Sequence, residues 1–189
     1  ELVSPIVQTV ERKANDNAAE YIVILADMYS FGLGKEASSE IAFSLYLKAA
    51  ELGNLEAMCD LGYMYLVGQG VTIDQGKSSY WYKKSADLGY VHSMRDIGQN
   101  YLHGEGVIQS GEDAVRYFTL ASENNYAHGT MDLAYCYLNG IGVQKDLSKV
   151  RELFLLAIHQ DAERTMRALI SLQVDSKALL FGGDMIFSK

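Results

Sequence analysis

Apolar residues recur three and four positions apart along most of the chain, in stretches that end at glycines. In the segment 54–89, one stripe runs through Ala57, Leu61 and Tyr65 and stops at Gly68, and a second stripe follows before the segment ends. Spacings of three and four residues place side chains on one face of an α-helix. The pattern therefore predicts two amphipathic helices joined by a turn that contains glycine.

The same heptad occurs four times, each copy 36 residues after the last: YSFGLGK, YLVGQGV, YLHGEGV and YLNGIGV. A fixed period decides the fold class, because each copy is one structural unit stacked on the next. Two nearby glycines could also form a phosphate-binding loop, but that motif follows a strand, and here it follows a helical pattern. The glycines are expected to form a left-handed turn between two helices. These turn glycines are Gly32, Gly34, Gly68, Gly70, Gly104, Gly106, Gly140 and Gly142.

The start of the second helix in each unit is marked by a capping residue. Ser38, Asp74, Ser110 and Asp146 stand at the same phase of the repeat. Their side chains can accept a hydrogen bond from the free amides of a first helical turn. Four suitable caps at one phase predict that a helix begins there each time.

Two further columns predict how the helices pack. Small residues recur at one position of the first helix and would let a neighbouring helix approach closely: Ala26, Gly62, Gly98 and Ala134. Aromatic residues recur in the second helix and are expected to fill the space between units: Tyr46, Tyr82, Phe118 and Phe154.

These residues resemble the Sel1-like repeat family, relatives of the tetratricopeptide repeats. The motif A-x-x-x-L-G-x-x-Y-x-x-G-x-G-V, followed by W-Y-x-K-x-A-x-x-G, is best preserved from Ala57 to Gly89. The resemblance extends over residues 17–172. It implies an all-α fold, an α-solenoid in which stacked helix-turn-helix repeats of period 36 form a right-handed superhelix.

The expected organisation is a single domain over residues 1–189. It opens with a capping helix at 1–16 and continues with four repeats at 17–53, 54–89, 90–125 and 126–160. The first helix of a partial fifth repeat follows at 161–173, and residues 174–189 form a C-terminal cap or a tail.

The charge of the chain bears on its partners. With 24 acidic and 16 basic residues the net charge is −8. This disfavours nucleic acid and anionic membranes, which need clustered Lys and Arg. It favours a basic protein partner, although solubility alone also accounts for it. No apolar run approaches the roughly 18 residues of a membrane span, so no membrane insertion is expected.

Other features leave the compartment open. The two cysteines, Cys59 and Cys136, form no metal-ligand pattern and no disulfide framework. The chain begins with Glu1, so a signal peptide could already have been removed, and a periplasmic and a cytoplasmic location both remain open. We expect a soluble monomer without a cofactor or a metal.

The resemblance to tetratricopeptide repeats implies that the first helices line an extended concave surface that binds a protein. Residues on these helices that packing does not need are the candidate binding residues: Tyr63, His92, Arg95, Gln99, His128, Met131, Tyr135 and Arg167. The basic residues among them predict a groove less negative than the rest of the protein. Two alternatives remain open: each His pairs with the Asp four residues later on its own helix, and Tyr63 and Tyr135 are half-packed core residues.

No nucleophile stands near a base at a recognisable spacing, so the sequence favours a non-catalytic interaction module. The family resemblance implies an adaptor in signalling or protein quality control, or an immunity protein that neutralises a secreted bacterial effector. A second class is a small-molecule binder or enzyme, as cysteine-rich Sel1-like proteins have been linked to β-lactams. The positions that match the paired cysteines of that branch are Ala50 and Met58 here, which weakens this analogy.

Overall fold

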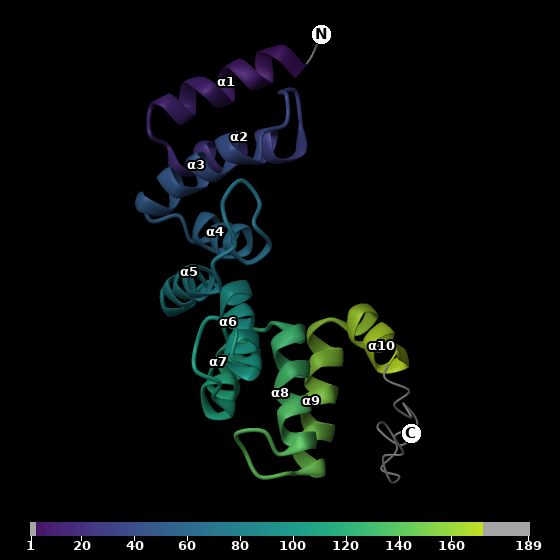
Figure 1. Cartoon of the computed structure of the whole chain (residues 1–189). Helices are drawn as coiled ribbons and strands as arrows, with labels where there is room; N and C mark the ends of the chain where they lie inside the picture. The colour runs from purple at the N-terminus through teal and green to yellow at the C-terminus, as the bar shows by residue number, and fades with distance from the viewer. Residues whose placement is uncertain (1–2, 172–189) are drawn as a thin grey trace. The chain divides into compact units, whose positions relative to one another are not determined.

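The computed structural model describes residues 3–171 and contains ten α-helices and no strand within them (Figure 1). The helices are α1 (Val3–Asn15), α2 (Ala19–Phe31), α3 (Ser39–Glu51), α4 (Leu55–Val67), α5 (Gln75–Asp87), α6 (Val91–His103), α7 (Gly111–Glu123), α8 (Ala127–Asn139), α9 (Leu147–Gln160) and α10 (Ala162–Ser171). The all-α prediction is confirmed. The expected cap or tail at 174–189 lies outside the described residues. No helix among those described is long and apolar enough to cross a membrane.

The chain divides into two compact units, which are described separately. Unit 1 comprises Glu1–Ser93 and Glu105–Val107, and unit 2 comprises Met94–Gly104 and Ile108–Lys189. Consecutive helices pack as pairs within each unit, α2 with α3 and α4 with α5 in unit 1, and α8 with α9 in unit 2. Helices α8 and α9 run side by side and antiparallel in Figure 1. The expectation of a single domain stays a prediction.

The four predicted caps begin the second helices. The side chains of Ser38, Asp74, Ser110 and Asp146 each accept a hydrogen bond from the backbone N–H three residues later. The capping residue itself is extended in every case, with φ between −152° and −148°. These bonds satisfy amides that would otherwise lack a partner at the helix start, which explains the fixed phase of the caps.

The eight turn glycines are all left-handed, with φ between 66° and 76°. The second glycine of a turn also lies against the preceding repeat. A Cβ added to Gly70 would come within 2.1 Å of the Ser39 carbonyl oxygen, and one added to Gly106 within 1.9 Å of the Gln75 carbonyl oxygen. The turn therefore packs on the start of the second helix one repeat earlier, which no other residue type would permit.

The small and aromatic columns meet inside one repeat. A Cβ on Gly62 would lie 2.6 Å from the Tyr82 ring, and a Cβ on Gly98 would lie 2.6 Å from the Phe118 ring. Each aromatic ring therefore packs on the small residue of its own helix pair. Tyr46 also lies in one buried cluster with Met58 and Leu61 of the following repeat. The expectation that these rings fill the space between units stays a prediction for the others.

Each unit has its own core. In unit 1, Ile22, Ala26, Met58 and Leu61 are buried together with Tyr46. In unit 2, the buried cluster includes Ala114, Phe118, Leu133, Val150 and Phe154. Helix α1 covers the outer side of α2, where Val7 and Val10 pack against Met28.

The repeat register shifts by one residue before α10. The first helices begin at residues 19, 55, 91 and 127, a step of 36, but α10 begins at 162. Asp161 alone separates α9 from α10, and its side chain accepts a hydrogen bond from the Arg164 backbone N–H at 3.0 Å. Met166, which packs against the unit 2 core, therefore stands at the repeat position of Met131, and Arg167 stands one position beyond it.

Candidate protein-binding surface

The predicted binding residues differ in how far they reach solvent. Tyr63 is 52% exposed and Tyr135 is 50% exposed, so half of each side chain lies outside the core. Arg95, Gln99, His128 and Met131 are half-buried, while His92 and Arg167 are exposed. The histidine rings contact the tyrosine two residues earlier, with ring centroids 5.4 Å apart in both Tyr90–His92 and Tyr126–His128.

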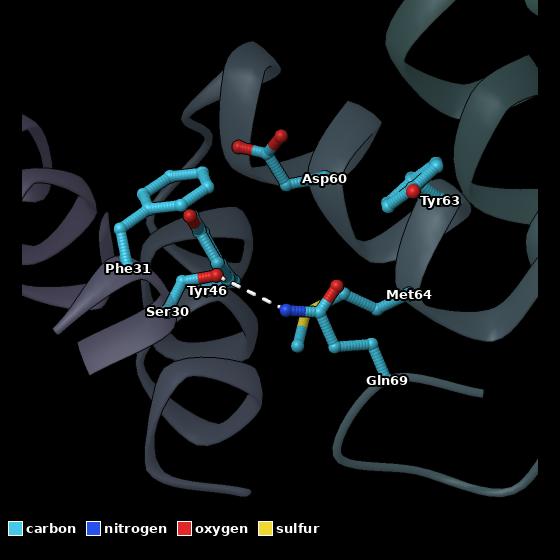
Figure 2. A pocket seen from close by; sticks show the side chains of 7 residues that line it. All are labelled: Ser30, Phe31, Tyr46, Asp60, Tyr63, Met64 and Gln69. Atoms are coloured by element: carbon cyan, nitrogen blue, oxygen red, sulfur yellow. Dashed lines mark hydrogen bonds between the residues drawn. The ribbon is translucent and has the colours of Figure 1, made fainter. Parts of the chain in front are cut away.

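A hollow of about 270 Å³ lies beside Tyr63 in unit 1 (Figure 2). Its lining comes from the end of α2, from α3, from α4 and from the turn after α4: Ser30, Phe31, Tyr46, Asp60, Tyr63, Met64 and Gln69. The Gln69 amide donates a hydrogen bond to Ser30 Oγ at 3.1 Å, which ties the turn of one repeat to the first helix of the repeat before it. Phe31 is 71% exposed at the rim, although it is a large apolar residue.

The carboxyl group of Asp60 is the unusual group in this hollow. Burial, together with the nearby carboxylates of Asp27 and Glu56, raises its pKa to about 7. The Tyr46 hydroxyl donates a hydrogen bond to Asp27 at 2.5 Å. Burial and this bond raise the pKa of Tyr46, so its hydroxyl stays a donor. Asp60 itself has no hydrogen bond or ion pair among the described residues.

The carboxylate of Asp60 recurs at the same repeat position in Asp96 and Asp132, both in unit 2. At the second of these, Arg95 Nε donates a hydrogen bond to Asp132 Oδ2 at 2.7 Å. The residue at the position of Arg95 in unit 1 is Val23, which is buried in the core and carries no charge. This carboxylate position is therefore paired with an arginine at Asp132 and lacks one at Asp60.

Neighbouring positions show the same contrast. Asp27 and Glu56 of unit 1 correspond to Gln99 and His128 of unit 2, again 72 residues later. Burial lowers the pKa of His128, and the charges of Arg95 and Arg164 lower it further. The surface of the first helices is thus acidic around the unit 1 hollow.

The arginines of the candidate surface lie beside carboxylates. Arg95 pairs with Asp132, Arg164 lies 3.7 Å from Asp161, and Arg167 lies 2.5 Å from Glu163 on its own exposed helix face. Each positive charge is offset by a carboxylate beside it, and the expectation of a groove less negative than the rest of the protein stays a prediction. The sequence pattern showed the arginines but not the carboxylates that they meet.

The buried cysteine, Cys136, is poorly suited to act as a nucleophile. Burial raises the pKa of the Cys136 thiol to about 12, with a smaller contribution from Asp132, so the thiolate needed for nucleophilic attack is scarce at neutral pH. Ala50 and Met58, the positions of the paired cysteines in the β-lactam-linked branch, are both buried apolar residues. Between residues 3 and 171, no group of three His, Cys, Asp or Glu side chains is placed to hold a metal ion.

The repeat geometry agrees with a known family. The Sel1 repeat model matches residues 19–54, 55–90, 91–126 and 127–161, which together make up most of the chain. The chain belongs to the Sel1 repeat family. A search of curated proteins gave no match.

Several solved structures share the Sel1 repeat fold. The protective antigen c5321 of uropathogenic Escherichia coli is 27% identical with a TM-score of 0.79, and the match covers 88% of this chain and 36% of that one. The present chain thus spans about a third of that antigen's length. A Sel1 repeat protein from Oxalobacter formigenes is 24% identical with a TM-score of 0.82, covering 94% of this chain and 70% of that one. The immunity protein Pa5087 of Pseudomonas aeruginosa is 21% identical with a TM-score of 0.56, and the match covers 85% of this chain and 60% of that one.

Membership places the chain in a family of protein-interaction repeats, which are generally non-catalytic scaffolds. At 24% and 21% identity, the likeness to the Oxalobacter and Pseudomonas proteins concerns the fold. A more specific function must therefore be argued from the side chains of this protein.

Proposed function

We propose that this Sel1 repeat protein is a non-catalytic module that binds a protein partner on the exposed side of its first helices. The observation that carries the proposal is the pair Tyr63 and Tyr135, half-exposed at the same repeat position in unit 1 and in unit 2. Tyrosine combines a large apolar ring with a hydroxyl and is enriched at the centres of protein interfaces. Packing within the repeat does not require half of each ring to face solvent.

The sharper form of the proposal is an immunity protein that neutralises a secreted bacterial effector. The net charge of −8 and the acidic hollow beside Tyr63 favour a basic partner. An adaptor in signalling or protein quality control would use the same surface, and the identity of the captured partner distinguishes these roles. A β-lactam enzyme is disfavoured by the buried Cys136 thiol and by the apolar residues at positions 50 and 58.

Site-specific photo-crosslinking tests the proposal. p-Benzoylphenylalanine placed at position 63 or 135 should crosslink one protein from a native lysate, which mass spectrometry then identifies. Tyr80 supplies the matched control, because it is a tyrosine with 57% exposure on the second helix α5. Crosslinking to the same protein at position 80, with none at 63 or 135, would overturn the assignment of the surface. A β-lactam turnover assay on the same protein should show no activity.

A further inference from the structure

The unit 1 hollow has the size of a single side chain. Its volume of about 270 Å³ equals roughly nine water molecules at about 30 Å³ each. It falls just below the roughly 300–1,000 Å³ of pockets that enclose drug-sized ligands. A hollow of this size suits one long side chain inserted from a partner surface better than a separate organic ligand.

The charge inside the hollow specifies a cation. The charged groups that act on Asp60 are Asp27 and Glu56, both carboxylates, so each carboxylate disfavours the ionised form of Asp60. A positive charge brought to this place would remove that repulsion and restore the ionised form. The residues described here offer no cluster of ligands suited to a metal ion, which leaves an organic cation.

Unit 2 shows which cation fits this position of the repeat. There, the guanidinium of Arg95 donates a hydrogen bond to Asp132 at 2.7 Å, from the first helix one repeat earlier. In the repeat before Asp60 the residue at that position is Val23, so Asp60 lacks the arginine that Asp132 receives. Among the described copies of this carboxylate position, Asp132 thus receives an arginine from the repeat before it, and Asp60 does not.

Aromatic rings near Asp60 favour arginine over lysine. Phe31 and Tyr63 are both exposed, and in Figure 2 the Asp60 carboxylate projects from its helix on the side of the hollow where Phe31 and the Tyr46 hydroxyl lie. A guanidinium is planar, stacks on aromatic faces and is more weakly hydrated than an ammonium group. It also forms paired hydrogen bonds with a carboxylate, which a lysine cannot do.

We infer that the unit 1 hollow receives an arginine side chain of the protein partner, with Asp60 accepting the guanidinium as Asp132 accepts Arg95 in unit 2. The inference rests on the proposed function, and it adds the chemistry of the partner's anchor. The Phe31 and Tyr63 rings flank the side chain. Gln69, held by Ser30, closes the hollow on the side of the turn.

The test uses the full chain, labelled with ¹⁵N, and titrates it with N-acetyl-arginine-N-methylamide at pH 8 in low salt. Saturable shifts of backbone amides are expected between Asp60 and Gln69, with a dissociation constant in the millimolar range. The citrulline analogue, which has the same shape without the charge, and the lysine analogue should each bind at least about fivefold more weakly. Equal binding of the citrulline analogue would show that charge is not recognised, and tighter binding of the lysine analogue would exclude arginine.

Two substitutions at equivalent positions provide the matched comparison. Asp60→Asn should weaken binding of the arginine probe by about tenfold, as expected when a hydrogen bond to a charged group is lost. Asp132→Asn should leave the shifts around Asp60 unchanged, because its own arginine already occupies that position. At pH 5, where the group is protonated, binding of the arginine probe to the unsubstituted protein should weaken in the same way.

No saturable shift, or unchanged affinity in Asp60→Asn, would overturn the inference. These failures are separable from failure of the proposed function. Crosslinks at position 63 without an arginine effect would leave a protein-binding surface that uses another anchor. Binding of the arginine probe without crosslinks at 63 or 135 would support the hollow as a site for a side chain, and would contradict the proposal that the first helices form the wider binding surface.

Discussion

Replacing Asp60 with asparagine should stabilise the protein at alkaline pH. The pKa of Asp60 rises from an ordinary value of 3.8 to about 7 because the group is buried beside two other carboxylates. A difference of about three units, at about 1.4 kcal/mol per unit, sets an upper limit of about 4 kcal/mol on the destabilisation caused by the ionised form. Asparagine has nearly the same shape and carries no charge.

The pH dependence has a definite sign. Because the folded pKa is raised, the folded protein binds more protons than the unfolded chain between about pH 4 and pH 7. The contribution of Asp60 to stability is therefore lost as the pH rises through this window. The asparagine amide would be partly buried at a position where the Asp60 side chain has no hydrogen bond among the described residues, which costs roughly 1–3 kcal/mol. We expect a net gain of about 1–3 kcal/mol at pH 8, and a much smaller gain or a loss at pH 4.

Urea unfolding followed by circular dichroism at pH 4, 6 and 8 measures the difference in unfolding free energy between Asp60→Asn and the unsubstituted protein at each pH. Asp132→Asn is the control at the equivalent position, where the carboxylate is paired with Arg95. It should destabilise the protein by roughly 1 kcal/mol at pH 8. A loss of stability in Asp60→Asn at pH 8, or a gain of equal size at pH 4 and pH 8, would refute the electrostatic explanation.

Three further predictions follow from the described contacts. Gly32→Ala should cost about 1–2 kcal/mol of unfolding free energy from its left-handed backbone alone, because its φ is 69° and the nearest atom to a Cβ is 3.6 Å away. Gly70→Ala has nearly the same φ of 68° but would meet a carbonyl oxygen at 2.1 Å, so its thermal unfolding temperature should fall further; equal losses would contradict this contact between repeats. A double-mutant cycle on Arg95 and Asp132 in urea should give a coupling energy of roughly 1 kcal/mol, and a value near zero would mean that the pair is not formed in solution. The NMR-measured pKa of His128 should lie below its ordinary value and should rise in Arg95→Met, since that charge lowers it; an unchanged value would exclude this cause.

The sequence predicts the helix pairs well because their signals are local. The capping side chains act three residues along the chain, and the turn glycines recur at a spacing that only a repeat explains. The left-handed conformation was expected for the first glycine of a turn, such as Gly68 and Gly104. The close approach of Gly70 to the preceding repeat was not expected, because that contact joins Gly70 to Ser39 across the fold.

The binding surface could be predicted only in part. Helix phase indicated that Tyr63 and Tyr135 reach solvent, and both do. Whether the Asp60 carboxylate has a cationic partner depends on the residue at the matching position of the previous repeat. The difference between Val23 and Arg95 at that position could be interpreted only after the structure showed the ion pair between Arg95 and Asp132. The position of Arg167 depended on an unbroken period, whereas α10 begins 35 residues after α8 rather than 36.

The claim that the first helices bind the partner is tested most directly by calorimetry with the protein captured in the crosslinking experiment. Tyr63→Ala and Tyr135→Ala should each weaken binding by about 1–4 kcal/mol if they are anchors of the interface. Tyr80→Ala, an equally exposed tyrosine on α5, should change the binding free energy by less than about 0.5 kcal/mol. Circular dichroism must show that all three variants are folded. Normal binding by the folded Tyr63 and Tyr135 variants, together with a loss of binding in Tyr80→Ala, would contradict the account and place the partner on the second helices.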